Sequence, residues 1–214
     1  MIRLLIADDH TIMREGLKRI LEGAEDIQVV DEASNGFEVL EKVRKGGFDQ
    51  VLLDLSMPGR SGVDLIRQMR LEAPQILILV LTMYDEGQYA VRALQAGAQG
   101  YLTKESAGSQ LVHAIRRIAT GRPYISVELA EQLAMNLMAP KEWLPHKRLT
   151  DREFEIFNQL VAGKSITEIA KMRHLSVKTI STHKTHVLAK MGMNAISEMV
   201  LYAVAHQLIE HYEP

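Results

Sequence analysis

The chain has 214 residues, of which 47% are hydrophobic and 24% charged, with a formal net charge of -2 and no cysteine. This composition is typical of a folded globular protein with one or two domains, and it excludes a disordered or fibrous chain, a disulfide framework and thiolate chemistry. No apolar run approaches the roughly 20 residues that span a bilayer, and charge appears too early for a signal peptide. We therefore expect a cytoplasmic protein with no membrane partner.

The first part of the chain alternates short apolar runs with amphipathic stretches. The apolar runs predict five buried strands, at Ile2–Ala7, Ile27–Val30, Val51–Leu53, Ile76–Leu81 and Gly100–Leu102. Apolar residues at helical spacing predict helices between them, at Thr11–Gly23, Gly36–Lys45, Gly62–Glu72, Glu86–Ala96 and Ser109–Thr120. This alternation predicts an α/β fold, a five-stranded parallel sheet that is doubly wound with helices on both faces.

The pattern changes after Gly121. A connector, GRPYIS, leads into a predicted helix from Val127 to Met138, and the stretch APKEWLPHKR gathers two prolines and mixed charge. We expect a first domain at 1–122, a linker with a connector helix at 123–146, and a second domain at 147–214.

The last part of the chain shows no strand pattern and predicts an all-α domain. Thr150 and Glu153 form a capping-box pattern before a helix that ends at Val161, and Ser165 and Glu168 repeat it. A third helix is predicted from about Ser176, and a fourth is predicted over Asn194–Leu208. The short turns between these helices are typical of a helix-turn-helix.

Charge is distributed unevenly between the two parts. Residues 1–122 hold 15 Lys and Arg against 17 Asp and Glu, whereas residues 147–190 hold 9 against 4. The predicted third helix leaves small polar and basic groups on its outer face, namely Lys178, Thr179, Ser181, Thr182, Lys184 and Thr185. Such groups approach bases and phosphates closely, so the pattern favours DNA, although a solvated helix face has the same pattern.

Five polar residues fall at the carboxyl ends of the predicted strands, where ligands bind in open parallel sheets. Asp8 and Asp9 follow the first strand, Asp54 ends the third, Thr82 ends the fourth and Lys104 follows the fifth. Three clustered carboxylates repel one another unless a cation lies between them, and Mg²⁺ prefers such oxygen ligands. A carboxylate also attacks phosphorus to give an aspartyl-phosphate, which Lys104 and Thr82 would stabilise. An Asp pair after a strand is by itself often only a helix cap.

The segments IADDH, LLDLSMPGRSG, LVLT and GAQGYLTKE resemble, in order, the signatures of bacterial receiver domains, which have a flavodoxin-like fold. The resemblance implies that Asp54 is the phosphoacceptor and that Lys104 and Thr82 hold the phosphoryl oxygens. It implies a Mg²⁺ site made by Asp8, Asp9, Asp54 and the backbone carbonyl of Ser56. It also implies that Tyr101 is a switch residue that moves inward with Thr82, and that Ser56 and Tyr84 influence the attack of water on the phosphoryl group. From its bulk we expect Tyr84 to shield that group.

The stretch 147–208 resembles the LuxR-type helix-turn-helix, and both parts together resemble response regulators of the NarL/FixJ class. By this resemblance Ser181, Thr182 and Thr185 face bases, while Lys178 and Lys184 serve mainly phosphates. Relatives carry lysine or valine at the base-facing positions, so their target motif does not transfer. The implied partners are a sensor histidine kinase or small phosphodonor, double-stranded DNA, and a second copy of the chain in a homodimer.

The function predicted from sequence is therefore a response regulator in which phosphorylation of Asp54 controls DNA binding, and not an enzyme. A Mg²⁺-dependent phosphohydrolase is one alternative, but its Asp-x-Asp pair is missing because Leu55 and Ser56 follow Asp54. A DNA-binding protein with an inert receiver and a pure interaction module are two further alternatives.

Overall fold

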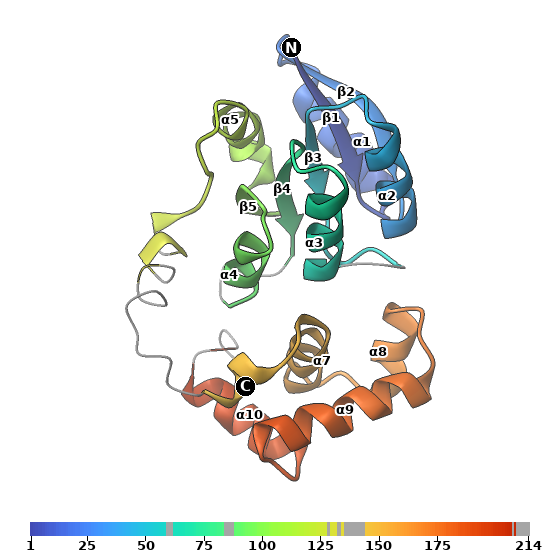
Figure 1. Cartoon of the computed structure of the whole chain (residues 1–214), viewed down its shortest axis with the longest axis vertical. Coiled ribbons are helices and arrows are strands. Elements are labelled where there is room, and N and C mark those ends of the chain that lie inside the picture. The colour runs from blue at the N-terminus through green and yellow to red at the C-terminus, as the bar shows by residue number, and fades with distance from the viewer. Residues whose placement is uncertain are drawn as a thin grey trace. The chain divides into compact units, whose positions relative to one another are not determined.

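The computed structural model describes residues 1–58, 62–83, 88–127, 129–131, 134, 144–206 and 208. Contacts within the chain separate two compact units, Met1–Met138 and Ala139–Pro214 (Figure 1). Most of the predicted connector helix at 127–138 lies outside the described residues, as do Gly59 and Tyr84.

The first unit is built on a five-stranded parallel sheet in the order β2-β1-β3-β4-β5. Its strands are β1 (Ile2–Ala7), β2 (Ile27–Ala33), β3 (Gln50–Leu53), β4 (Leu77–Thr82) and β5 (Gly100–Thr103). The helices between and after them are α1 (Thr11–Leu21), α2 (Gly36–Lys45), α3 (Gly62–Glu72), α4 (Gln88–Gln95) and α5 (Ala107–Ala119). The predicted doubly wound α/β fold is confirmed.

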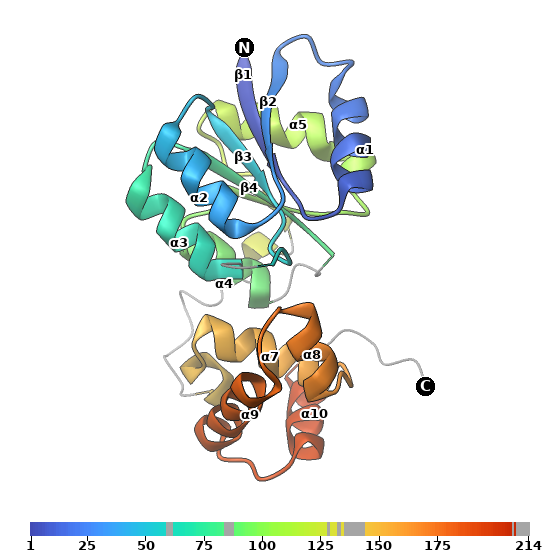
Figure 2. The same cartoon turned by 90° about the vertical axis from the view of Figure 1, so that its right-hand side faces the viewer.

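Helices cover both faces of this sheet. Figure 2 shows α1 and α5 on one side and α2, α3 and α4 on the other. The apolar side chains of α1 and α5, among them Leu17, Leu21 and Ile115, join those of the strands in one buried cluster. Their removal from water is the main force that holds the helices on the sheet.

Strand register brings the ends of β1 and β3 together. Ala7 pairs with Leu53, and the backbone N–H of Asp54 donates to the carbonyl of Ala7 at 2.8 Å. At the other side of the sheet Thr82 pairs with Thr103. The residues that follow these strands therefore share one edge, as predicted.

Most element boundaries lie within two residues of those predicted from the sequence, and β2 is the main difference. The sequence predicts that this strand ends at Val30, since the charged residues Asp31 and Glu32 follow, but the strand continues to Ala33. Val29 pairs with Leu4 and Asp31 with Leu5, so Val30 is an extra residue in a β-bulge. Such a bulge lets two polar residues continue the strand.

The segment after α5 lies along the free edge of β5. Tyr124 forms a parallel bridge with Gly100, its N–H donates to Gln99 and its carbonyl accepts from Tyr101, both at 3.0 Å. A side chain at Gly100 would clash, because a Cβ there would lie 2.6 Å from Ile118 Cδ1. The start of the predicted linker thus belongs to the packed first unit.

The second unit is all-α, as predicted. It contains a 3-10 helix, η1 (Pro145–Arg148), and the helices α7 (Asp151–Val161), α8 (Ile166–Met172), α9 (Val177–Met191) and α10 (Ile196–Ala205). Both predicted capping boxes are formed, by Thr150 with Glu153 and by Ser165 with Glu168. The last helix is shorter than predicted by two residues at its start and three at its end.

A small aromatic and aliphatic core holds these helices together. Phe154 and Phe157 of α7 stack at 6.0 Å between ring centroids, and Ile169, Ile180 and Val187 are fully buried with them. Among the described helices none is long and apolar enough to cross a membrane alone. Within the same described residues, α9 and α10 have the length and composition of a membrane span when taken together, but they are bent by 56° at the break between them.

Candidate functional site

Two of the predicted carboxylates lie side by side at the carboxyl edge of the sheet. Asp8 follows β1 and Asp54 follows β3, and both are almost fully buried, with 1% and 2% of their surface exposed. The Asp8 N–H donates to the carbonyl of Ala33 at 3.1 Å, which ties this loop to the end of β2. Two buried carboxylates on adjacent strands repel each other unless a cation is present.

Lys104 provides such a cation. Its Nζ lies 2.6 Å from Oδ2 of Asp8 and 2.9 Å from Oδ2 of Asp54, and only 6% of its side chain is exposed. The N–H of Lys104 donates to the carbonyl of Thr82 at 2.8 Å, which fixes it beside the end of β4. The other oxygen of Asp54, Oδ1, accepts from the N–H of Ser56 at 2.9 Å. Both carboxylate oxygens of Asp54 therefore have a donor.

Burial changes the protonation balance of this pair. It raises the pKa of Asp54, and the opposing effects of Lys104 and the Ser56 amide do not cancel this increase. Burial also lowers the pKa of Lys104, but the attraction of Asp54 and Asp8 outweighs it and the pKa is raised. Lys104 thus stays charged, while one ammonium is shared between two buried carboxylates. The site therefore carries a net negative charge, which a further cation would neutralise.

Asp9 and His10 complete a cluster that can hold a metal ion. One ligand atom from each of Asp8, Asp9, His10 and Asp54 lies within 4.8 Å of the others. Oδ2 of Asp8 and Oδ1 of Asp9 are buried and accept no well-formed hydrogen bond from the described part of the chain, although Lys104 Nζ lies near the first and His10 Nδ1 near the second. The three carboxylates supply the hard oxygen ligands that Mg²⁺ prefers, so the residues fit the group.

The imidazole of His10 borders this cluster. Its Nδ1 lies 3.2 Å from Oδ1 of Asp8 and 3.0 Å from Oδ1 of Asp9, and its backbone N–H donates to Asp8 Oδ1 at 2.8 Å. The ring is largely exposed. These contacts orient the two carboxylates.

Thr82 and Tyr101 are both fully buried, at the end of β4 and within β5. The ring of Tyr101 therefore already lies in the inward position, which the family resemblance links to the phosphorylated state. Its backbone N–H donates to Tyr124 at the start of the linker. Of the two proposed switch residues, Tyr101 thus borders the segment that leaves the first unit.

Two residues at this site were not singled out from the sequence. Arg14 of α1 donates from Nη1 to the backbone carbonyl of Asp8 at 2.7 Å and from Nε to Glu32 of β2 at 2.8 Å. Arg14 is on the first turns of an amphipathic helix, where an arginine is normally part of the solvated face. The sequence contains no signal that pairs it with Glu32, because the bulge in β2 sets that contact.

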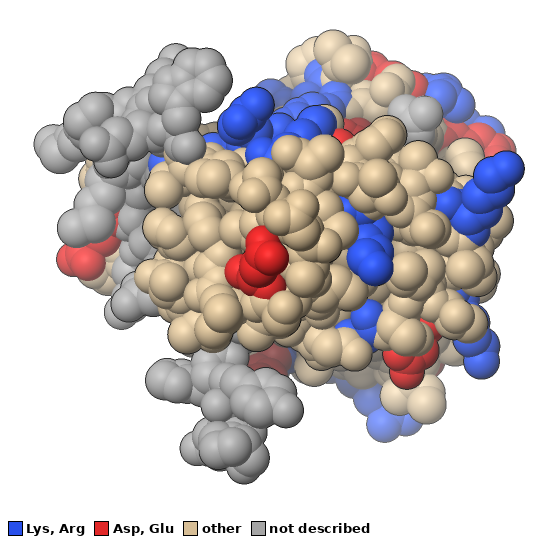
Figure 3. Space-filling model, turned by 90° about the horizontal axis from the view of Figure 1, so that it is seen from below, with Lys and Arg blue, Asp and Glu red and all other residues tan. Residues whose placement is uncertain are grey.

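In the second unit, α9 presents the polar side chains predicted to face DNA. Lys178, Ser181, Thr182 and Thr185 are exposed, whereas Thr179 and Lys184 are half-buried. The hydroxyls of Thr182 and Thr185 donate to the carbonyls of residues 178 and 181, at 3.0 and 3.1 Å. Figure 3, seen from below the view of Figure 1, shows mainly uncharged side chains, with Lys and Arg scattered among them and a few Asp and Glu. Such a surface is suited to close approach by a polyanion.

Charge pairs link α7 to the end of α8 and to α9. Glu155 of α7 is 3% exposed and lies 2.9 Å from Arg152 and 3.4 Å from Arg173, which follows α8. Lys190 of α9 lies 2.6 Å from Glu153. These pairs hold the three helices in one arrangement.

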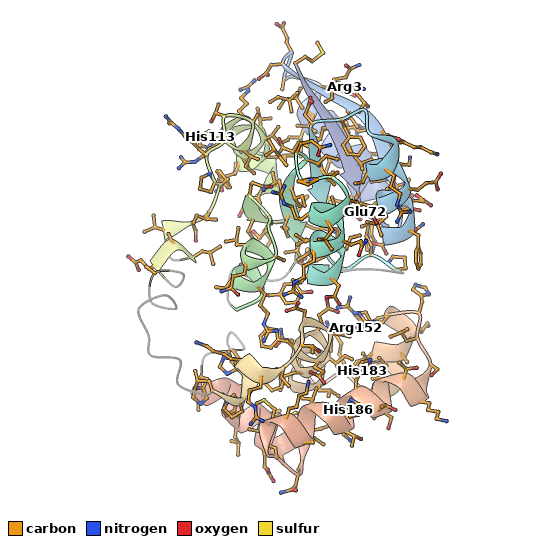
Figure 4. All side chains as sticks on the ribbon, viewed as in Figure 1. Arg3, Glu72, His113, Arg152, His183 and His186 are labelled. Carbon is orange, nitrogen blue, oxygen red and sulfur yellow. The ribbon has the colours of Figure 1, made fainter. Side chains whose placement is uncertain are left out.

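His183 faces inward from α9, toward Arg152 of α7 (Figure 4). Burial lowers the pKa of His183, and the charge of Arg152 lowers it further. A neutral His183 on the inner side leaves the opposite side of α9 for the exposed residues Lys178, Ser181, Thr182 and Thr185.

Comparison with known proteins identifies both units. Residues 4–116 match the family model of the response regulator receiver domain, and residues 147–203 match that of bacterial regulatory proteins of the luxR family. Escherichia coli response regulator UvrY is 34% identical over 209 residues, 97% of this chain and 96% of its own length. Pseudomonas syringae response regulator GacA is 35% identical over 211 residues, 98% of this chain and 99% of its own. Staphylococcus epidermidis oxygen regulatory protein NreC is 35% identical over 217 residues, with 98% and 100% covered.

Solved structures give the same assignment. RcsB from Salmonella typhimurium superposes with a TM-score of 0.69 at 28% identity, over 95% of this chain and 97% of that one. RcsB bound to the promoter rprA in the presence of the phosphomimetic BeF3⁻ superposes with a TM-score of 0.66 at 28% identity, over 96% and 100%. The chain therefore belongs to the NarL/FixJ family of response regulators, with a receiver domain followed by a LuxR-type DNA-binding domain.

Proposed function

We propose that phosphorylation of Asp54 in the receiver domain controls the binding of DNA by α9. The observation that carries the proposal is the buried contact of Asp54 with Lys104, 2.9 Å from Oδ2 to Nζ, beside Asp8 and Asp9. This places a nucleophilic carboxylate next to a cation and a cluster that fits a metal ion. These are the groups that phosphoryl transfer requires.

In the proposed reaction a carboxylate oxygen of Asp54 attacks the phosphorus of a phosphohistidine on a sensor kinase, or of a small phosphodonor. The O–P bond forms as the bond from phosphorus to the leaving group breaks, and the leaving group keeps the electron pair and takes a proton from solvent. Lys104 moves from the carboxylates to a phosphoryl oxygen, and the Thr82 hydroxyl donates to another. Thr82 ends β4 and Lys104 directly follows β5, so the backbone of both donors is held at the edge of the sheet.

Mg²⁺ is the proposed cofactor. Asp9, Asp54 and the backbone carbonyl of Ser56 would hold it directly, and Asp8 would hold it through water. When bound, the ion neutralises charge on the phosphoryl oxygens. The support for this assignment is the oxygen-rich cluster at the end of β1 and β3.

The proposed output is DNA binding by a homodimer. The Thr82 side chain would move toward the phosphoryl group, and the Tyr101 ring would pack behind it. This rearrangement would reach the linker through the hydrogen bond from the Tyr101 N–H to the carbonyl of Tyr124. Ser181, Thr182 and Thr185 would then face bases while Thr179, Lys178 and Lys184 support contacts to the backbone. Solved RcsB structures include DNA complexes and dimers, which supports the same output here.

Within this proposal the domains are a receiver at 1–122, a linker at 123–146 and a DNA-binding domain at 147–214, working in the cytoplasm. The protein is not proposed as a turnover enzyme. A phosphohydrolase of similar design needs a second acid after the nucleophile, but Leu55 is apolar and fully buried and Ser56 has no carboxylate.

Intact mass spectrometry tests the first step. Wild type incubated with a small phosphodonor and Mg²⁺ is expected to gain the mass of one phosphoryl group, and Asp54→Asn is expected to gain none. Asp64→Asn, which removes an exposed carboxylate of α3, is the control and should behave as wild type. Equal labelling of wild type and Asp54→Asn would contradict the proposal.

A further inference from the structure

We infer that Arg14, held by Glu32, is a positioning residue that fixes the acidic loop for binding of a divalent cation. The inference rests on the proposed function, because it concerns the same cluster of carboxylates. Arg14 touches none of these carboxylates. It acts on the peptide that joins Asp8 to Asp9.

The guanidinium of Arg14 bridges three parts of the receiver domain. It donates to the carbonyl of Asp8 at 2.7 Å, to Glu32 Oε2 at 2.8 Å and, more weakly, to Thr11 Oγ1 at 3.4 Å. Only 15% of the Arg14 side chain is exposed. The planar guanidinium makes these directed bonds simultaneously, which a single ammonium group cannot reproduce.

The orientation of the Asp8 carbonyl affects the positions of both the Asp8 and the Asp9 side chains. This carbonyl belongs to the peptide plane between Asp8 and Asp9, so its direction sets where both side chains leave the backbone. The N–H of Asp8 is already fixed by Ala33. The bond from Arg14 fixes the other side of the residue, and with it the spacing of two predicted ligands.

Glu32 is in turn locked in place. The bulge at Val30 sets the register of the end of β2, and Glu32 there contacts α1. Its Oε1 accepts from Lys18 at 2.8 Å, and its backbone carbonyl accepts from Lys42 of α2. The ion pairs with Lys18 and Arg14 lower the pKa of Glu32 despite opposing burial, so it remains charged at neutral pH. The chain Lys18–Glu32–Arg14–Asp8 therefore links α1, β2 and the acidic loop.

Charge and position have opposite effects here, which makes the inference testable. A cation beside a metal site weakens binding of Mg²⁺ by repulsion, so simple loss of the Arg14 charge would strengthen binding. Loss of positioning would weaken it, and partners outside the ligand shell typically change metal affinity 10- to 100-fold. Variants that keep the charge separate the two effects.

The experiment is a calorimetric titration of Mg²⁺ alone into the full chain. Arg14→Lys keeps the charge but loses the bridging geometry, and Glu32→Asp keeps the charge but shortens the support for Arg14. Both are expected to bind Mg²⁺ about tenfold more weakly than wild type. Arg116→Lys is the matched control, because it makes the same substitution at an arginine that pairs with Asp26, and no described contact joins Arg116 to the acidic loop. It should bind within about twofold of wild type.

Thermal unfolding without Mg²⁺ establishes that each variant is folded. If wild type binds Mg²⁺ and both Arg14→Lys and Glu32→Asp bind it equally well, the positioning role is overturned while the proposed function stands. If wild type itself binds no Mg²⁺, the metal assignment in the proposed function is overturned together with this inference. Equally weak binding by Arg116→Lys would also overturn it, since the effect would then come from the loss of any arginine ion pair in the receiver domain.

Discussion

Lys104 and Asp54 form a buried ion pair, 2.9 Å from Nζ to Oδ2, although 50 residues separate them in the chain. The pair forms because β3 and β5 end at the same edge of the sheet, with β4 between them. Asp8 shares the same ammonium group. The site therefore holds two negative charges against one fixed positive charge, so its stability depends on how these charges are compensated.

Lys104→Met is expected to destabilise the receiver domain. It leaves Asp8 and Asp54 buried without their cation, and removing one partner of a buried pair costs about 3 kcal/mol in the free energy of unfolding. Urea denaturation measures this loss. Addition of Mg²⁺ is expected to restore part of it, because a bound cation replaces the ammonium charge. Lys45→Met, which removes an exposed lysine, should unfold like wild type.

Asp54→Asn is expected to raise the unfolding temperature of the receiver domain at neutral pH in the absence of Mg²⁺. Burial raises the pKa of Asp54, which means that the folded state holds the charged form at a cost. A neutral amide removes this cost and leaves Lys104 paired with Asp8. Thermal unfolding followed by circular dichroism gives the comparison, and an unfolding temperature below that of wild type would contradict the account.

Two variants of α9 are expected to affect DNA binding differently. Lys178→Ala should weaken binding to all sequences and reduce the dependence of log affinity on log salt by about 1, as for loss of one phosphate contact. Ser181→Ala should change the relative affinity for target and non-target duplexes by about 1 kcal/mol, as for a base contact. Fluorescence anisotropy at several salt concentrations measures both. Lys45→Ala in the receiver is the control for the loss of a lysine elsewhere in the chain. If it weakened DNA binding as much as Lys178→Ala, the proposed phosphate contact by Lys178 would be contradicted.

The pair of Glu153 and Lys190 is expected to give pH-dependent stability. Burial tends to raise the pKa of Glu153, but the bonds from Lys190 and from Thr150 outweigh burial and lower it from its ordinary value of 4.5. Because the pKa of Glu153 is lower in the folded state than in the unfolded state, the charged carboxylate stabilises the folded domain above pH 4.5. This stabilisation is lost as the pH falls through the pKa of the folded state. Unfolding temperatures of wild type and Lys190→Gln should therefore differ at pH 7 and converge below pH 4.5. A constant difference over this range would contradict the assignment.

Regular alternation made most of the receiver predictable. Short apolar runs identified all five strands, and the rule that ligands bind at the carboxyl ends of parallel strands brought together Asp8, Asp54, Thr82 and Lys104. Capping boxes located α7 and α8 because Thr150 and Ser165 bond to the third residue of each helix. These signals are local, or depend only on the order of elements.

The contact of Arg14 with Asp8 and Glu32 was not predictable in the same way. It depends on the bulge at Val30, which changes the direction of the strand end, and charged residues there indicate the end of a strand as readily as its continuation. The packing of Tyr124 on β5 was missed for a related reason. GRPYIS has the composition of a connector, and the space above Gly100 that accepts it is a tertiary feature.

The most direct test of the account is the affinity of wild type and Asp54→Ala for DNA at fixed salt, with and without a small phosphodonor plus Mg²⁺. The probe is a duplex selected from a random-sequence pool by the wild-type chain in the presence of the donor. We predict that the donor tightens binding by wild type and leaves Asp54→Ala unchanged. If the two proteins bind alike under all conditions, the receiver does not control the DNA-binding domain through Asp54.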